Sequence, residues 1–442
     1  MGYSSLLRKI ILIVGDVICL YLATSVAMAL ELGQKQMDKV AFHLEFLPIL
    51  IILMFFMFNV YGLFSLIRKR LVDIFLNLLV AIANIYILAM AMTFFFRQFD
   101  YSRVVLVYSA VFSFILLAVW QYICHQWEWR CLPKYTSVLF APAEEAARIK
   151  NKLAKTYGLE KTLQAVCDSC AAANNWQQLI DDHYCVFIGA ELPIAEKEQI
   201  LRYARSSKKQ IFFVPTLYEL ACKNTDFLLV DDIPMQRVSR MLLTAEQRVL
   251  KRILDITVAV TALILLAPIM LVTAIIIKID SQGPAIYSQE RVGLYGKTFY
   301  VHKFRSMQQN AEANCGPVLA AAGDSRITKF GRLMRATRLD ELPQLLNVLK
   351  GEMSIVGPRP ERPFFVQQFI AKKPEYDYRH NVKPGITGLA QIAGKYNTSA
   401  YDKLIYDLLY IQEVSVKTDL MIMLQTFKVL LTKSSTEGVQ GK

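Results

Sequence analysis

The sequence lacks the patterns that mark a disulfide-bonded, a repeat or a dinucleotide-binding protein. Its eight cysteines are scattered over 442 residues and suggest no disulfide framework. Cys167 and Cys170, with His183 and Cys185, have no second CxxC or HxxxH beside them, so buried core cysteines are favoured over a zinc site. No internal repeat is present. No small-residue cleavage site follows the first apolar run, which predicts an anchor rather than a removed signal peptide.

Long apolar runs are abundant instead. Hydrophobic residues make up 54% of the chain and the mean hydropathy is +0.33, which is high for a soluble protein. Four apolar segments come first, and each approaches the ~20 residues that a membrane-spanning helix needs. They cover residues 10–30, 42–64, 71–96 and 104–123. We therefore expect a transmembrane four-helix bundle over residues 1–134.

The net charge of +13 and its distribution suggest an orientation and a class of partner. Basic residues precede the first segment, separate the second from the third and follow the fourth: Arg8, Lys9, Arg68, Lys69, Arg70, Arg130 and Lys134. By the positive-inside rule both ends of the bundle are cytoplasmic. A basic protein can bind nucleic acid, anionic lipid or phosphate-rich substrates. The membrane segments favour lipid and phosphate, so no nucleic acid partner is expected.

Residues 135–245 have the alternating pattern of a cytosolic α/β, Rossmann-like domain. Strand candidates at 136–140, 163–166, 184–188 and 210–214 alternate with helix candidates. After the first strand the chain reads APAEEA, which cannot provide the close backbone approach of a GxGxxG loop. An interaction or regulatory role is therefore favoured over a bound nucleotide.

Residues 246–442 begin with a fifth apolar segment at 253–277. Lys251 and Arg252 precede it, Lys278 follows it, and Pro268 lies near its middle. An ordinary kinked spanning helix would place the rest of the chain across the membrane, but basic residues at both ends disagree with one crossing. We predict a re-entrant membrane helix broken at Pro268, followed by a mainly α-helical catalytic domain.

The stretch from Arg338 to Glu361 carries the strongest chemical signal. Asp340 and Glu341 are adjacent carboxylates that can attack phosphorus or hold Mg²⁺, a cation that prefers carboxylate and phosphate oxygens. Asp is also a preferred helix N-cap, so Asp340 is compatible with capping the helix that ends near Leu349. Arg359 is fixed between Pro358 and Pro360, and a rigid guanidinium suits phosphate.

Further basic residues are expected around the acids. Lys303 and Arg305 alternate in the strand-like run KFRSM, and Arg335 and Arg338 lie just before Asp340. Each could be an ordinary surface charge. Together, basic residues around two acids fit a diphosphate substrate with a metal.

Six segments together resemble the bacterial sugar transferase family, the monotopic phosphoglycosyl transferases. They read KRILDI, QERVG, KFRSM, DSRITKFGRLMR, LDELPQLLNVLKGEMSIVGPRPE and KPGITGLAQ. With the segments in front, the chain is similar to long members that initiate exopolysaccharide, capsule or O-antigen synthesis. The resemblance implies that a UDP-sugar donates sugar 1-phosphate to undecaprenyl phosphate and that UMP leaves. It also implies a bacterial inner-membrane location with cytoplasmic soluble domains, and it is compatible with a homodimer.

The family resemblance also implies roles for individual residues. Asp340 would form a phosphosugar intermediate, Glu341 would help to bind Mg²⁺, and the basic residues Lys303, Arg335 and Arg359 would organise the acids or bind phosphate and nucleotide. Two features depart from the family: Ala267 precedes Pro268 where Ser-Pro is common, and Glu413 and Val414 stand where an Asn-Trp-Ser run usually begins.

Two alternative functions are kept open. One is a multi-span glycosyltransferase that releases UDP, and the other is a non-catalytic membrane scaffold or regulator of polysaccharide assembly. The sequence does not identify the sugar.

Overall fold

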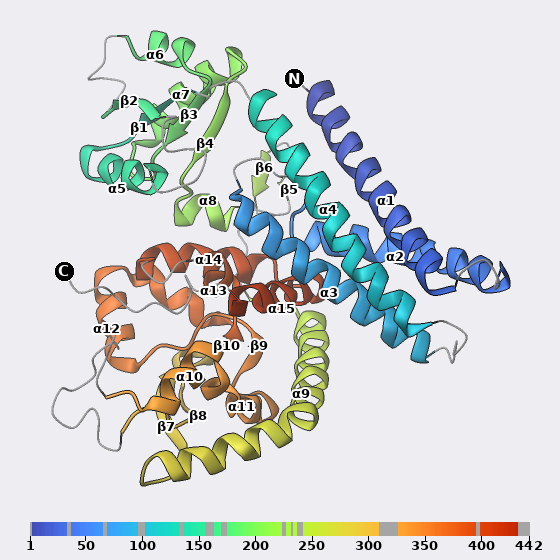
Figure 1. The fold of residues 1–442 in the computed structure, drawn as a ribbon. Coiled ribbons are helices and arrows are strands. Elements are labelled where there is room, and N and C mark those ends of the chain that lie inside the picture. Colours follow the sequence, from blue (N-terminus) through green and yellow to red (C-terminus); the bar gives the residue numbers. More distant parts are fainter. Residues whose placement is uncertain are drawn as a thin grey trace. The chain divides into compact units, whose positions relative to one another are not determined.

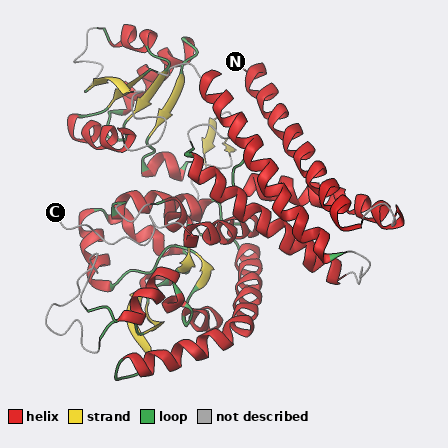
Figure 2. Cartoon of the chain, viewed as in Figure 1, coloured by secondary structure: helices red, strands yellow, loops and turns green. Residues whose placement is uncertain are grey.

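A computed structural model shows a mostly helical chain with small sheets (Figure 2). It describes residues 2–32, 37–64, 69–95, 102–131, 136–154, 163–168, 175–222, 227–230, 233–236, 242–308, 326–394 and 398–431. Arg68, Lys134 and Cys170, which the sequence singled out, lie outside these ranges. The chain forms two compact units, Met1–Pro215 and Thr216–Lys442. The second unit therefore begins within the segment 135–245 that the sequence assigns to the α/β domain.

The first unit begins with four apolar helices, as predicted. They are α1 (Gly2–Leu32), α2 (Met37–Val60), α3 (Leu71–Phe95) and α4 (Arg103–Cys131), shown in blue to cyan in Figure 1. Three of them, α1, α3 and α4, are long and apolar enough to cross a membrane, whereas the apolar stretch found in α2, Phe46–Val60, is shorter. Tyr86 on α3 makes hydroxyl hydrogen bonds of 2.6 and 2.8 Å with Ser109 and Ser113 on α4, which satisfies buried polar groups inside the bundle.

The rest of the first unit is the predicted α/β domain. Its four strands are parallel in the order β2-β1-β3-β4. The strands are β1 (Ser137–Phe140), β2 (Leu163–Cys167), β3 (Cys185–Ile188) and β4 (Gln210–Phe213), and the helices are α5 (Ala143–Ala154), α6 (Trp176–Asp182) and α7 (Ile194–Ser206). The central strand β1, SVLF, is buried along its whole length, as expected for a strand covered on both faces.

The second unit opens with α8 (Leu217–Ala221) and an antiparallel pair of strands, β5 (Phe227–Val230) and β6 (Ile233–Gln236). After α9 comes a hairpin of β7 (Ile286–Val292) and β8 (Thr298–Phe304). A 3₁₀ turn, η1 (Leu294–Gly296), joins the two strands, and Gly296 has a φ of +74°, which glycine adopts without a Cβ clash.

Most of the remaining elements of the second unit pack around a hydrophobic core that includes Val348, Val356 and Tyr410, while α10 and η2 pack in a smaller cluster with Met334. They are α10 (Lys329–Thr337), η2 (Leu339–Glu341), α11 (Gln344–Lys350), β9 (Ser354–Val356), α12 (Pro363–Lys372), η3 (Pro374–Asn381), β10 (Gly385–Thr387), α13 (Leu389–Ala393), α14 (Ala400–Gln412) and α15 (Val416–Leu431). β9 and β10 pair in parallel.

The fifth apolar segment forms one long helix, α9 (Ala245–Asp280), which begins with a Thr244–Gln247 capping box. The prediction of a break at Pro268 is wrong in detail, because the helix continues through the proline. Pro268 has no N–H to donate to the Ile264 carbonyl, and such a gap in the hydrogen-bond ladder allows bending. Figure 1 shows that α9 is bent. The part of α9 before Pro268 is called the first leg and the part after it the second leg.

Both ends of α9 are attached to the same unit. In the first leg, Lys251 Nζ donates to the Val356 carbonyl at 2.9 Å. At the other end, Ile277 is buried in a cluster with Phe304 and Met334. The middle of the helix is apolar and exposed: Ile264 and Leu265 are each 69% accessible. An exposed apolar bend with both ends on one polar domain is the geometry expected of a helix that enters a membrane and returns.

Candidate active site

The two predicted acids lie in a single tight turn. Asp340 and Glu341 belong to η2, between α10 and α11. Arg338 ends α10 in the left-handed conformation, with a φ of 55°, and this turns the chain sharply just before the acids. The alternative that Asp340 is the N-cap of the next helix is wrong, because α11 starts only at Gln344 and Pro343 is its N-cap. The Asp340 carboxylate is therefore not used for capping.

Glu341 is the centre of the positive charges. Its Oε1 accepts hydrogen bonds from Lys303 Nζ at 3.2 Å and from Arg359 Nη2 at 2.8 Å. Its Oε2 lies 3.9 Å from Arg338 Nη1. The Glu341 side chain is only 10% exposed, so these charge-assisted contacts operate in a partly dehydrated environment. Three of the predicted basic residues thus meet at one carboxylate.

Asp340 differs from its neighbour. Over the ranges that the structure describes, its carboxylate has no hydrogen bond and no ion pair within 4.0 Å. It nevertheless lies within the electrostatic influence of Lys303, Arg335 and Arg359. An unpartnered carboxylate held near several cations is available to contact an incoming phosphorus centre.

The two acids also differ in pKa. Burial and the adjacent Glu341 charge raise the pKa of Asp340 above its ordinary value. Burial acts the same way on Glu341, but Arg359 and Lys303 outweigh it and hold the pKa of Glu341 well below its usual range. Burial lowers the pKa of Lys303. Adjacent carboxylates with diverging pKa values are typical of sites that divide chemical roles.

The position of Arg359 is fixed by side chains that donate hydrogen bonds to main-chain carbonyls of its loop. The sequence did not predict these contacts. The Arg379 guanidinium donates to the Arg359 carbonyl at 2.9 Å and is ion-paired with Asp407 at the same distance. Arg291 donates to the Pro360 carbonyl at 3.1 Å. Arg291 lies in the QERVG segment, so the motif gave a signal for it. Arg379 lies in no motif, and its role follows only from the tertiary structure.

Arg305 does not join the acids, contrary to the expectation that it lies beside Lys303. The strand β8 ends at Phe304, so the alternation of side chains ends with it. Arg305 is 7% exposed, and its Nη2 donates to the Ser281 carbonyl at 2.6 Å and contacts Ser281 Oγ at 3.0 Å. A cation at the end of a helix is electrostatically favourable, so Arg305 anchors the end of α9.

Arg335 lies near Asp340, and its Nε donates to Ser306 Oγ at 2.9 Å.

Asn347, which the sequence analysis also missed, fixes α11 against β8. It is fully buried, accepts from the His302 N–H at 3.0 Å and donates to the Tyr300 carbonyl at 2.8 Å. These contacts set the separation between Lys303 on the strand and the acids that precede the helix.

The residues fit a metal only as a site shared with the substrate. Nowhere in the described ranges do three His, Cys, Asp or Glu side chains gather closely enough to hold an ion by themselves. Mg²⁺, however, is commonly bound by one or two carboxylates together with substrate phosphates and water. Asp340 has no competing partner among the described residues, and Glu341 Oε2 is beyond hydrogen-bond distance of Arg338. These oxygens are the donors that the site can offer.

Comparisons with known proteins identify the family of this chain. The family profile described as bacterial sugar transferase matches residues 246–433. A glucose-1-phosphate transferase of Caulobacter vibrioides, named as acting between UDP-glucose and undecaprenyl phosphate, is 43% identical over 189 residues, 41% of this chain and 70% of that protein. A Bacillus subtilis protein named as a putative undecaprenyl-phosphate N-acetylgalactosaminyl 1-phosphate transferase is 48% identical over 136 residues, 31% of this chain and 75% of that protein. The chain belongs to the bacterial sugar transferase family.

Longer relatives are matched over less of their length. A UDP-N-acetylgalactosamine-undecaprenyl-phosphate N-acetylgalactosaminephosphotransferase of Aeromonas hydrophila is 43% identical over 206 residues, 46% of this chain. The matched region spans 48% of that protein, and thus about half its length. The candidate site lies within residues 246–433, the range that the family profile matches.

A second family profile, described as a CoA-binding domain, matches residues 57–213. The α/β domain, however, does not fit a nucleotide diphosphate at the phosphate position that is usual for parallel sheets. In parallel sheets phosphates bind beyond the carboxyl ends of the strands, at the point where strand order reverses. Here that point lies between β1 and β3. The buried Glu145 carboxylate fills it and accepts from the N–H groups of Ala190 and Glu191 at 2.8 and 3.0 Å. A buried negative charge at this position disfavours a diphosphate.

Proposed function

We propose that this protein transfers sugar 1-phosphate from a UDP-sugar to undecaprenyl phosphate, releasing UMP. Family membership and the names of the relatives support a sugar-phosphate transfer onto a lipid phosphate. The observation that carries the proposal is the contrast between the two acids, with Glu341 bound by cations and Asp340 without a partner in the described chain.

In this proposal the reaction has two steps. An Asp340 carboxylate oxygen attacks the phosphorus that bears the sugar, and the bond from that phosphorus to the bridging oxygen breaks, so UMP leaves with that oxygen. An undecaprenyl phosphate oxygen then attacks the phosphosugar on Asp340, forming the lipid diphosphate sugar and freeing the carboxylate. Splitting the transfer in this way replaces one difficult encounter between two anions by two separate displacements.

The surrounding cations would serve both steps. Arg359 uses Nη2 for Glu341, and a guanidinium has five N–H groups, so others can bind phosphate oxygens. Lys303 and Arg335 would help to neutralise the negative charge that collects between donor and carboxylate. Glu341 keeps Lys303 and Arg359 in place while remaining ionised. Mg²⁺, held by Glu341 and Asp340 oxygens with the donor's phosphates, would add Lewis-acid stabilisation of the leaving phosphate.

We further propose that the bent helix α9 re-enters the inner membrane, so that the catalytic unit stays on the cytoplasmic face. Support comes from the attachment of both helix ends to one unit and from the exposed apolar middle. A lipid acceptor and a water-soluble donor could then meet at one surface. Labelling of a reporter placed at Lys442 should occur only in opened cells. Labelling in intact cells would contradict this orientation.

The function is tested by identifying the leaving group. Purified full-length protein is incubated with a panel of UDP-sugars, Mg²⁺ and undecaprenyl phosphate, and nucleotide products are separated. UMP release with one sugar is expected, and Asp340→Asn should abolish it while Asp377→Asn, a change at a carboxylate that is 66% exposed, should not. UDP release would support the glycosyltransferase alternative, and no turnover with any sugar would support the scaffold alternative.

A further inference from the structure

A pocket in the second unit, separate from the acids, is lined by the first leg of α9. Its volume is about 450 Å³. The lining is mainly basic and apolar, with Arg248, Arg252, Lys383, Val249 and Ile253, and it also includes the Asp255 carboxylate. A pocket that combines these two characters is suited to an amphipathic anion.

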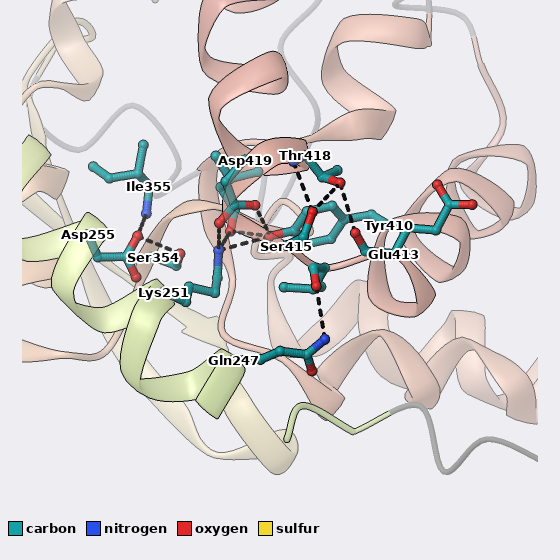
Figure 3. Close-up of polar contacts among 12 residues, drawn as sticks. Gln247, Lys251, Asp255, Ser354, Ile355, Tyr410, Glu413, Ser415, Thr418 and Asp419 are labelled. Atoms are coloured by element: carbon teal, nitrogen blue, oxygen red, sulfur yellow. Dashed lines mark hydrogen bonds and ion pairs between the residues drawn. The ribbon is translucent and has the colours of Figure 1, made fainter. Parts of the chain in front are cut away.

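One face of the α9 leg is committed to holding the unit together. Lys251 Nζ reaches Asp419 Oδ2 at 2.6 Å and Tyr410 Oη at 2.9 Å. One turn on, Asp255 Oδ1 accepts from Ser354 Oγ and from the Ile355 N–H at 2.8 and 2.9 Å. Figure 3 shows both side chains directed toward these partners. Lys251 is therefore ion-paired inside the protein, and Asp255 is hydrogen-bonded there by two neutral donors.

Arg252, which also lines the pocket, is engaged as well. Its two terminal nitrogens donate to the Val348 and Leu349 carbonyls at 2.6 and 2.7 Å, at the end of α11. The situation of Arg248 and Lys383 is different. Within the ranges described for this chain, neither side chain has a hydrogen-bonded or ion-paired partner.

Lys383 is placed where an anion would stabilise it. Its Nζ and Arg252 Nη2 both lie beside Gly351, so two cations share a small space. Burial and the nearby charge of Arg252 lower the pKa of Lys383, and they outweigh the Asp255 carboxylate, which acts in the opposite direction. A bound anion would reverse this, because an opposite charge favours the charged form of a lysine.

The outer face of the same leg is apolar and unprotected. Val249 and Ile253 are each 58% exposed, and Ile256 and Val260 continue the stripe with 40% each. Their spacing of three or four residues places them on one side of the helix. The stripe runs from the basic pocket toward the exposed bend around Ile264.

We propose that this pocket binds the phosphate headgroup of an anionic membrane phospholipid through Arg248 and Lys383, with an acyl chain lying along the Val249–Val260 stripe. The inference rests on the proposed membrane position of α9. A headgroup there would fix the depth and tilt of the first leg in the membrane surface, because the charge sets the depth and the stripe sets the direction.

The reacting phosphate is not the one bound here. Glu341 precedes α11 and Gly351 follows it, and the seven residues of this helix rise about 10 Å. A phosphate at Lys383 therefore lies too far from Asp340 for attack. The bound lipid would be a structural ligand rather than the acceptor.

The test measures lipid retention by the full-length chain in detergent, using native mass spectrometry. Phosphatidylglycerol, phosphatidylcholine with the same chains, undecaprenyl phosphate and inorganic phosphate are each titrated. One phosphatidylglycerol should be retained in preference to phosphatidylcholine. Arg248→Gln/Lys383→Gln should weaken retention by about tenfold or more, since two charge-assisted contacts are lost. The matched control Lys372→Gln/Lys417→Gln removes two charges outside the pocket lining and should retain the lipid.

Ile253→Gln is a second variant, at an exposed position where folding is not at risk, and it should weaken retention of long-chain lipid. Unchanged phosphatidylglycerol binding in the Arg248/Lys383 double variant would overturn the proposal. So would equal binding of phosphatidylcholine, displacement by inorganic phosphate, or displacement by undecaprenyl phosphate. Because UMP release is measured separately, a failure of this site is distinguishable from a failure of the transferase reaction.

Discussion

The Arg359 guanidinium donates a 2.8 Å hydrogen bond to the Glu341 carboxylate, 18 residues earlier in the chain. This contact joins the turn that carries the two acids to the proline-flanked loop of Arg359. It neutralises the charge of Glu341 within the protein. Lys303 contacts the same oxygen, Oε1, from a third segment. The arrangement leaves Asp340 as the carboxylate able to approach a substrate, and the predictions below follow from it.

Replacing Glu341 by Gln should destabilise the second unit by on the order of 1–3 kcal/mol, because Lys303 and Arg359 lose their shared anion but remain partly hydrated. Thermal unfolding at neutral pH measures this, with Glu375→Gln as the control. Because the pKa of Glu341 is depressed in the folded protein, its carboxylate stabilises the fold at every pH above its ordinary pKa near 4.5. This stabilisation is lost only as the pH falls through the lower pKa of the folded state. Wild type and variant should converge only in strong acid, and equal stability at neutral pH would contradict the account.

The pH dependence of transfer should reflect Asp340. Its raised pKa means that the attacking carboxylate is lost as pH falls through a value above the ordinary 3.8, so kcat/KM should decline on the acid side there. Arg335 lowers this pKa, so Arg335→Gln should move the acid limb to higher pH. Arg332→Gln, an exposed change on the same helix, should not move it. An unmoved limb in the Arg335 variant would show that Asp340 does not set the profile.

Variants of the Arg379–Asp407 pair should distinguish a role in stability from a role in positioning Arg359. Either single variant, Arg379→Met or Asp407→Leu, leaves a buried charge unpaired and should lose about 3–5 kcal/mol of stability. The double variant should recover much of that stability. It should still show a raised KM for the UDP-sugar, because the Arg359 carbonyl has lost the donor that holds it. A normal KM in a stable double variant would rule out the positioning role.

Chelation should stop turnover. The described residues hold no cluster of three ligand side chains, so Mg²⁺ at Asp340 and Glu341 would be shared with the donor and should exchange readily with EDTA. A loss of about 100-fold or more, reversed by excess Mg²⁺, is expected if the ion stabilises the leaving phosphate. Circular dichroism in EDTA checks that the fold persists. Full activity in EDTA would mean that Lys303, Arg335 and Arg359 suffice without a metal.

Much of this structure could be predicted from local sequence patterns, because those patterns act through local physics. Apolar runs and alternating strand candidates depend on neighbouring residues, and the predicted helices and strands formed close to their expected positions. The pairing of acids with basic residues also emerged, since the motif places Asp340 and Arg359 around one short helix.

What could not be predicted depends on where a strand ends or on contacts between distant segments. Arg305 was assigned to the site by alternation, but β8 stops one residue earlier and the side chain turns to the end of α9. Arg379 supports Arg359 through a main-chain carbonyl, which leaves no residue-type signature. The continuity of α9 through Pro268 likewise reflects packing at both helix ends, which a local rule about proline does not include.

The most direct measurement is to map the covalent intermediate. Full-length protein is incubated with the accepted UDP-sugar and Mg²⁺ without undecaprenyl phosphate, quenched and digested, and the peptides are weighed. We predict a sugar-phosphate adduct on Asp340 that disappears when undecaprenyl phosphate is added and that is absent from Asp340→Asn but present in Asp377→Asn. Steady UMP release with no adduct on Asp340, or an adduct on another residue, would contradict the account.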